Sequence, residues 1–221
     1  MLAWLSPGFP IGSFAFSHGL EAAVASGAVR DRASLQLWIR ATVVSGGGRI
    51  DADILRDAHR ASSAGDVRAL MEANRRGIAF RATAETRLET TAQGDAFLAA
   101  CRAAWPNPFL DCWAEGLSEC GGAVCYAAAV GASTAQAGIA LDCALLGYLQ
   151  ALASNLVSAG LRLGIIGQTD GQRILAALEP VIGAAVAGAL TRAPDAFGSA
   201  TFAVELASMD HETQYSRLFR S

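Results

Sequence analysis

Two long stretches without a charged side chain, residues 120–141 and 143–161, occupy the second half of the chain. Either is long enough to cross a bilayer as a helix. Glycine and polar residues interrupt the first stretch near its middle, and the leucines of the second recur at roughly helical spacing. A helix that is apolar nearly all round is typical of the centre of a bundle. We therefore expect both stretches to form buried core helices, with a helical membrane protein as the alternative.

The rest of the composition agrees with a helical core. Alanine, which has the highest helix propensity, makes up about a fifth of the chain. Hydrophobic residues account for 52% and charged residues for 17%, which argues against disorder. A length of 221 residues suits one domain, and no β-type alternation extends beyond a few residues. The sequence predicts an all-α fold, a single-domain multi-helix bundle of about eight to ten helices over residues 1–221.

Capping residues, glycines and prolines divide the chain into the expected helices. Asp31 or Ser34, Asp66 and Asp170 have N-cap chemistry. Pro180 predicts a kink or a break in the helix that contains it. The expected helices cover residues 13–27, 31–45, 51–61, 66–88, 96–105, 109–116, two segments of 119–163 broken near 131–136, then 171–190 and 202–215.

The chain contains no lysine, because all 17 of its cationic side chains are arginine. A P-loop NTPase needs a lysine on the phosphates, a Schiff-base enzyme needs a lysine amine, and a protein kinase needs its strand lysine. The chain also lacks a nucleophile elbow and a G-x-G-x-x-G motif. We therefore predict a protein that is not an enzyme and needs no cofactor.

Charge and cysteine content restrict the partners and the compartment. The formal net charge is −3 without a basic cluster, so nucleic acid is not an expected partner. The five cysteines lack C-x-x-C spacing, unlike a disulfide framework or a zinc knuckle, and are expected to be mostly buried. Residues 1–10 lack the features of a signal peptide, which favours a cytoplasmic protein. A soft-metal site assembled from scattered cysteines and histidines stays open as an alternative.

Most polar clusters have a plain structural interpretation. His18 and Glu21 lie at i, i+3 on an expected helix, where they form one face of a site or a capping or partner-facing pair. His59 lies among charged residues that predict a solvated face. Glu85 and Arg87 predict an exposed ion pair of little energetic value.

The C-terminal segment, residues 200–221, is unusual for a chain end. Its residues 209–221 read MDHETQYSRLFRS, whereas termini are normally small, polar and frayed. His211 and Glu212 begin an H-E-x-x-Y sequence that lacks the second histidine of the zinc-protease motif. The tail either folds back onto its own core or orders against a partner. Its aromatic and arginine side chains are typical of binding hot spots, which favours docking on a partner.

Four segments form a recognisable series along the chain. The opening, residues 6–21, follows the pattern S-P-x-x-P-x-G-x-(aromatic)-x-x-S-x-G-L-E. Residues 84–87 read AETR, residues 167–173 read GQTDGQR, and the tail from residue 211 reads HETQYSRLFRS. Together these segments resemble the UreF family of urease accessory proteins over nearly the whole chain, and the tail is the most specific of them.

The resemblance implies a cytoplasmic, all-α, homodimeric scaffold without catalytic activity. Such proteins assemble with UreD, also called UreH, and with the GTPase UreG. They support and regulate GTP-dependent nickel insertion into apo-urease. The GTP chemistry then belongs to a partner. A protein that binds nickel directly through cysteine or histidine is the alternative.

The resemblance also implies partner-binding residues in the opening and the tail. Arg217 matches a family arginine that is implicated in the partner complex. Phe14 matches an aromatic position that is often tyrosine, so a hydrogen bond from a tyrosine hydroxyl has no counterpart here. Asp210 stands where arginine is common, which reverses the local charge. The candidates are Phe14, His18, Glu21, His211, Glu212, Tyr215, Arg217, Leu218, Phe219 and Arg220.

Overall fold

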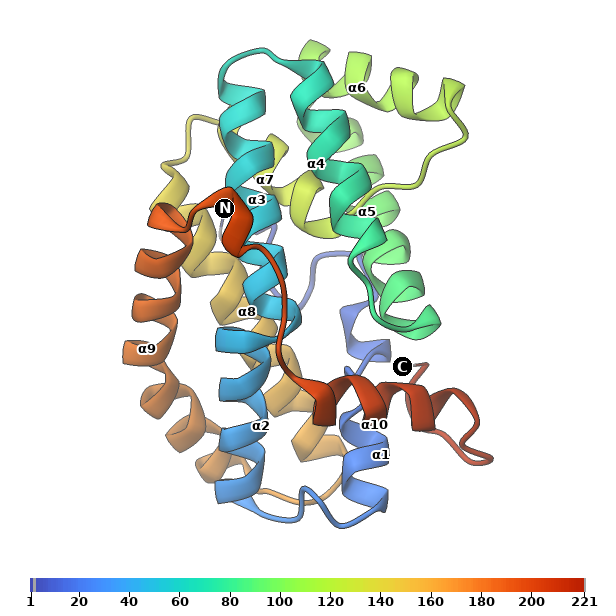
Figure 1. Ribbon diagram of the computed structural model, residues 1–221, viewed down its shortest axis with the longest axis vertical. Helices are drawn as coiled ribbons and strands as arrows, with labels where there is room; N and C mark the ends of the chain where they lie inside the picture. Colours follow the sequence, from blue (N-terminus) through green and yellow to red (C-terminus); the bar gives the residue numbers. More distant parts are fainter. Residues whose placement is uncertain (2, 221) are drawn as a thin grey trace.

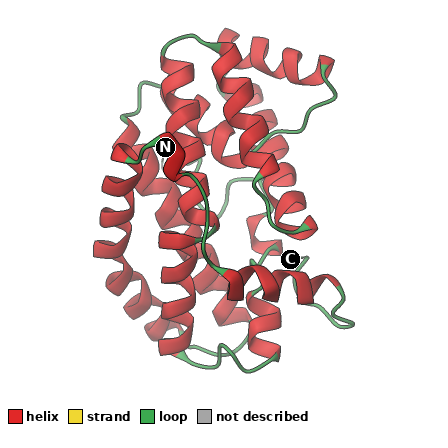
Figure 2. Ribbon diagram, viewed as in Figure 1, coloured by secondary structure: helices red, strands yellow, loops and turns green. Residues whose placement is uncertain are grey.

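The computed structural model describes residues 1 and 3–220, and this part of the chain forms helices and loops without a strand (Figure 2). The prediction of an all-α fold is therefore confirmed. The elements in chain order are η1 (Ser13–Ala15), α1 (Leu20–Ala25), α2 (Arg32–Ser45), α3 (Gly47–Ser63), α4 (Val67–Ala79), α5 (Ala84–Ala104), α6 (Pro108–Glu119), α7 (Tyr126–Gln136), α8 (Leu141–Arg162), α9 (Gln168–Thr191), η2 (Pro194–Ala196) and α10 (Phe202–Glu212), where η marks a 3-10 helix.

Helices α3 and α7 pack closely together at the centre of the molecule (Figure 1). Residues 127–134 of α7 are all buried, and all of them are small or β-branched. Small side chains let the neighbouring backbones approach. At Gly131, for example, a Cβ atom would lie 2.5 Å from the carbonyl oxygen of Leu55 in α3. The alanine-rich sequence thus serves close packing as well as helix propensity.

The remaining helices cover this pair. Helices α8, α9 and α2 pack against one another and against α3, whereas α4, α5 and α6 gather at the other end of the molecule (Figure 1). The last helix, α10, packs against α1 and α5. The C-terminal segment therefore lies beside the opening of the chain.

The uncharged stretch 120–141 divides later than expected. Helix α7 continues through residues 131–136, and the chain breaks at residues 137–140, where Gly138 has φ of 67°. With 11 residues, α7 is too short to cross a bilayer. By length and composition alone, α8 and α9 are long and apolar enough to do so. Helix α8 buries one side in the core, as expected of a core helix.

Gly94 and residues 80–83 correct two expected helix boundaries. An interruption was expected at Gly94, but helix α5 continues through it. A Cβ atom at this position would overlap the carbonyl oxygen of Val124, which explains why the residue is glycine. This glycine permits a close approach and does not break the helix. The helix expected over 66–88 is divided, because Thr83 caps the start of α5 through a capping box with Thr86.

Other helix ends agree only in part. Asp31 and Asp66 are N-caps as predicted. Asp170 lies inside the first turn of α9, whose N-cap is Gly167, and α9 runs through Pro180 without a break. Helix α3 begins four residues before the expected start at residue 51, at Gly47. The helix expected over 13–27 shortens to η1 and α1, because residues 18 and 19 both have positive φ.

Candidate functional site

The C-terminal tail folds back onto the opening of the same chain. His211 is fully buried, the ring of Phe219 is 4% exposed, and the Arg220 N–H donates to the carbonyl oxygen of Ala15 over 2.7 Å. Of the two predicted alternatives, the structure shows the tail folded back onto its own core, and docking on a partner stays a prediction. The sequence did not show that acceptors for the tail lie in α1 and α5 of its own fold.

His211 lies between two buried carboxylates. Its Nδ1 is 2.9 Å from both oxygens of Glu85 in α5, and its Nε2 is 3.0 Å from Oε2 of Glu21 in α1. Arg217 Nη1 donates to Glu85 Oε1 over 3.0 Å. We call Glu21, Glu85, His211 and Arg217 the His211 cluster. The cluster joins α1, α5 and the C-terminal segment by charge-assisted hydrogen bonds.

Glu21 also holds the backbone of the tail. Its Oε1 accepts from the Leu218 N–H over 2.6 Å, and its Oε2 accepts from the Phe219 N–H over 2.9 Å. Burial alone would raise the pKa of Glu21. The hydrogen bonds from Leu218, His211 and Phe219 outweigh this effect and lower the pKa below its ordinary value. Glu21 is thus held as a carboxylate that fixes the path of the chain end.

Small residues bring α10 close enough for these contacts. Gly19 has φ of 71°, and a Cβ atom there would lie 2.6 Å from the backbone nitrogen of Ser208. The Ser208 hydroxyl is 2.8 Å from the hydroxyl of Thr83, the N-cap of α5. Glu212 accepts from the Ala84 N–H over 3.0 Å. Helix α10 is therefore fixed mainly by polar and close backbone contacts.

Arginine side chains join the opening to the tail. Arg162 in α8 donates to the carbonyl oxygen of Phe14, and its guanidinium lies 4.0 Å above the ring of Phe219. The guanidinium of Arg220 lies 5.9 Å from the ring of Phe16. Such contacts combine apolar packing with cation–π attraction. The opening motif and the tail form one continuous structure.

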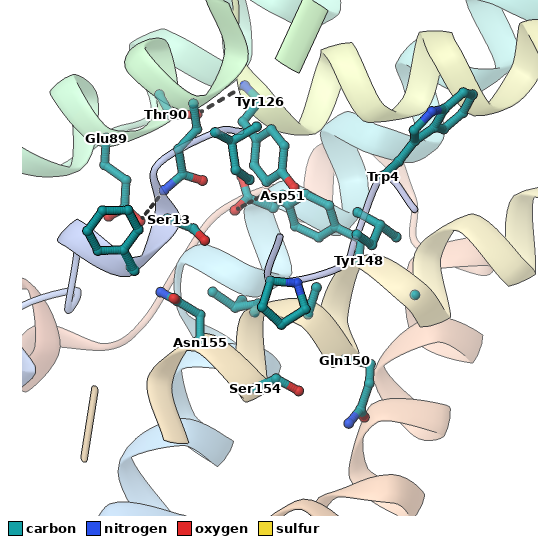
Figure 3. Close-up of a pocket in the computed structure, with 18 of the residues that line it drawn as sticks. Trp4, Ser13, Asp51, Glu89, Thr90, Tyr126, Tyr148, Gln150, Ser154 and Asn155 are labelled. Atoms are coloured by element: carbon teal, nitrogen blue, oxygen red, sulfur yellow. Dashed lines mark hydrogen bonds between the residues drawn. The ribbon is translucent and has the colours of Figure 1, made fainter. Parts of the chain in front are cut away.

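A cavity of about 360 Å³ lies beneath the opening segment, lined by residues from the opening, α3, α5 and α8 (Figure 3). Among its polar lining residues are two pairs of titratable side chains. His18 Nε2 is 3.2 Å from Glu89 Oε1. Asp51 pairs with Arg81 and accepts from the Tyr148 hydroxyl over 3.0 Å. Each acidic side chain at the cavity, Glu89 or Asp51, is therefore paired with a basic one, His18 or Arg81.

Burial and neighbouring charges shift the protonation of these groups. Burial opposes a charge on His18, but the attraction of Glu89 and its hydrogen bond, helped by Asp51 and opposed by Arg81, raise the pKa of His18. Burial raises the pKa of the Tyr148 hydroxyl, and the charge of Asp51 adds to this effect. His18 is therefore favoured as a cation, and Tyr148 remains a neutral donor.

Comparison with known proteins decides the family. The UreF family model matches residues 29–179. A urease accessory protein UreF of Bradyrhizobium sp. (strain BTAi1) is 48% identical over 221 residues, which are 100% of this chain and 90% of the relative. Its counterpart in Azorhizobium caulinodans is 47% identical over the same 221 residues, which are 94% of that relative. The chain belongs to the UreF family.

Several of the candidate residues lie together in the structure. Glu21, His211, Arg217 and the backbone of residues 218 and 219 meet at the His211 cluster. Phe14, Tyr215 and Leu218 are exposed by 69%, 104% and 61%. His18 lies at the cavity with Glu89 and not with Glu21. A helical i, i+3 pair was expected, but His18 precedes α1 and has φ of 53°.

Sequence reasoning missed the role of Glu85. The prediction of an exposed Glu85–Arg87 ion pair is wrong, because Glu85 is buried and pairs with His211 and Arg217. Its place in a family-like segment was the only signal. The solvated face expected around His59 is also wrong, because His59 is 9% exposed and its Nε2 is 2.8 Å from the carbonyl oxygen of Ile139.

The cysteines do not assemble into a site in the described part of the chain. Cys101 and Cys125 are buried, as expected of small hydrophobes, whereas Cys112, Cys120 and Cys143 are exposed. Within residues 1 and 3–220, no three His, Cys, Asp or Glu side chains are arranged so that they could hold a metal ion. The direct nickel-binding alternative therefore gains no support from side-chain geometry.

Proposed function

We propose that this protein is a non-catalytic scaffold of urease maturation. It forms a homodimer in the cytoplasm, assembles with UreD (UreH) and the GTPase UreG, and supports GTP-dependent nickel insertion into apo-urease. The observation that carries the proposal is the similarity to named urease accessory proteins over the whole chain, at 48% identity. Nickel is the cargo of this assembly and not a resident cofactor.

The exposed residues around the His211 cluster support a partner surface there. Phe14, Tyr215 and Leu218 expose large side chains near a tail backbone that Glu21 holds through the N–H groups of residues 218 and 219. Exposed aromatic anchors are the residue types that dominate binding energy. A fixed backbone reduces the entropy that is lost on binding. The proposed surface therefore combines anchors with preorganisation.

Light scattering after size-exclusion chromatography tests the assembly. The protein alone should be a dimer, and it should form a larger stoichiometric complex with its cognate UreD and then with UreG. If the folded wild-type protein forms no complex with either, the proposed function is wrong.

Point variants test the surface. Tyr215→Ala should weaken binding by about tenfold or more, and Arg217→Ala should cost about 2 kcal/mol of binding. Arg75→Ala is the matched control, because Arg75 is also an exposed arginine in an ion pair, with Glu72 on α4. Equal affinity of the Tyr215, Arg217 and Arg75 variants would remove the tail from the binding surface.

A further inference from the structure

The cavity beneath the opening of the chain is built from segments that lie far apart in the sequence (Figure 3). The N-terminal segment contributes Trp4 and Ile11, α5 contributes Gln93, and α8 contributes Tyr148 and Asn155. A volume of about 360 Å³ lies within the range of pockets that hold small organic molecules. The cavity therefore has the size of a binding site, and the chemistry of its wall indicates the class of molecule that fits it.

Aromatic rings give the cavity an apolar surface. The rings of Tyr126 and Tyr148 lie 5.3 Å apart between centroids and are tilted by 41°. Tyr126 also contacts Phe97, with 5.6 Å between the ring centroids, and Trp4 contacts Phe97 in turn. These rings hold one another in place. A wall of fixed aromatic side chains packs well against an aromatic or other apolar body.

The charged side chains of the wall already have partners of opposite charge. Among the described lining residues they are His18, Glu89, Asp51 and Arg81. Glu89 pairs with His18 over 3.2 Å, and Asp51 pairs with Arg81. A charged guest would lose its hydration without gaining an unpaired side chain of opposite charge on this wall. The wall therefore favours a neutral molecule.

Two amides on the wall have an oxygen left over for a guest. Gln93 is 5% exposed, and its Nε2 donates to Glu89 Oε1 over 2.9 Å. Asn155 donates from Nδ2 to the carbonyl oxygen of Phe16 over 3.3 Å. Within the described part of the chain, the side-chain oxygen of neither amide accepts a hydrogen bond. An amide oxygen is an acceptor, so the complementary guest carries N–H or O–H groups.

The hydroxyl of Tyr126 is a third polar group on the wall. Tyr126 bonds to Thr90 through its backbone N–H, over 3.4 Å, whereas its hydroxyl makes no hydrogen bond to a described residue. Burial and the charge of Asp51 raise the pKa of this hydroxyl, so it keeps its proton. It can donate to an acceptor on the guest or accept from a donor.

We propose that this cavity binds a neutral small organic molecule that has an aromatic or other apolar body and carries N–H or O–H groups. The body packs against the rings of the wall, and the donors reach the amide oxygens of Gln93 and Asn155. The hydroxyl of Tyr126 pairs with a polar group of the guest. Because the N-terminal segment, α3, α5 and α8 all line the cavity, a bound molecule joins them. The inference does not depend on the proposed function.

Three probes of equal size test the class of guest. Benzamide is neutral and has N–H donors, benzoate is its anionic counterpart, and benzamidine is its cationic counterpart at neutral pH. In a ligand-observed NMR titration of the full chain, benzamide should bind with a dissociation constant of about 1 mM or lower. Benzoate and benzamidine should each bind about tenfold more weakly or less, because the wall offers no unpaired charged side chain.

Variants of the wall test the place of binding. Ala151→Leu extends a lining side chain of α8 into the cavity and should weaken benzamide binding by about tenfold or more. Ala184→Leu is the matched control, because Ala184 is exposed on α9 and does not line the cavity. Its affinity should stay within about twofold of wild type. Tyr126→Phe keeps the ring contacts and removes the hydroxyl, and it should weaken binding by about fivefold.

Each outcome decides for or against the cavity. Benzamide binding that is lost in Ala151→Leu, weakened in Tyr126→Phe and retained in Ala184→Leu supports the proposal. No binding of benzamide to the folded wild-type protein at about 10 mM overturns it. Equal binding of the three probes overturns the neutral class of guest. Binding that neither Ala151→Leu nor Tyr126→Phe changes overturns the site, because the probe then binds elsewhere. All of these overturning results leave the proposed function standing.

Discussion

At the scale of single residues, the His211 cluster is a set of charges that satisfy one another. A neutral imidazole has one N–H, whereas both nitrogens of His211 face carboxylate oxygens. The ring of His211 thus contacts a carboxylate on each side, and Arg217 donates to Glu85 as well. Loss of any buried member leaves another charge without its partner.

Glu21→Gln is the sharpest test of this balance. Near neutral pH it should lower the free energy of unfolding by about 3 kcal/mol, because a buried ion pair loses one partner. The folded pKa of Glu21 lies below its ordinary value of 4.5, so its contribution is present above that value and is lost as pH falls through the folded pKa. Urea unfolding at several pH values should show the difference from wild type shrinking in acid.

Glu212→Gln is the control for this measurement. Glu212 is exposed and accepts from the Ala84 N–H, and glutamine keeps an acceptor oxygen. Its stability should stay within about 0.5 kcal/mol of wild type. A Glu21→Gln protein as stable as this control would show that the cluster does not stabilise the fold.

His18 titrates in the opposite sense. Its folded pKa is raised above 6.5, so the stability that it contributes is fully present below 6.5 and is lost as pH rises through the folded pKa. His18→Asn removes the imidazole and suits the positive φ of this position. The stability difference between wild type and variant, measured by urea unfolding, should be larger at pH 5.5 than at pH 9. A constant difference would assign His18 a packing role only.

At the scale of elements, two glycines inside helices should respond oppositely to alanine. Gly183→Ala in α9 meets no atom within 4 Å, so it should stabilise the protein by about 0.5–1 kcal/mol. Gly94→Ala in α5 gains the same helix propensity, but its new Cβ atom would clash with the backbone of Val124. This variant should therefore destabilise the protein by about 1–3 kcal/mol. Thermal unfolding measures both. Equal effects would mean that the α5 contact relaxes without cost.

The local sequence predicted where some helices begin or end but not others. Asp31 and Asp66 cap helices through hydrogen bonds to residues three positions later, so the sequence contains the whole signal. Gly94 carries the same local signal as a helix break. Its actual role depends on the carbonyl of Val124, which a sequence pattern does not place beside it. Helix existence was therefore predictable, whereas several boundaries required the tertiary structure.

At the scale of the whole molecule, the tail connects the C-terminal end of the chain to the opening segment, α1 and α5. Deletion of residues 214–221 removes no residue of α10 but takes away Arg217, Phe219 and the amides that Glu21 binds. The midpoint of thermal unfolding should fall by several degrees, since about 2 kcal/mol or more is lost. The far-UV circular dichroism of the folded protein should stay nearly constant. An unchanged midpoint would show that the tail contacts add no stability.

Three members of the His211 cluster were among the candidates predicted from the sequence, whereas Glu85 and the geometry of the cluster were not. The resemblance selected Glu21, His211 and Arg217, which do lie together. It did not reveal Glu85 as the carboxylate between His211 and Arg217, because a short charged motif on a helix has the same pattern whether buried or exposed. Burial depends on which distant segment covers the helix, and α10 supplies that cover.

The hydrogen bond between Glu21 and His211 spans 190 positions of the sequence. During synthesis Glu21 leaves the ribosome long before the imidazole and the tail amides that hold it. The carboxylate of Glu21 in α1 therefore lacks these partners until residues 211–219 have been synthesised. A nascent chain that stalls before residue 211 lacks this closing contact between α1 and the C-terminal segment.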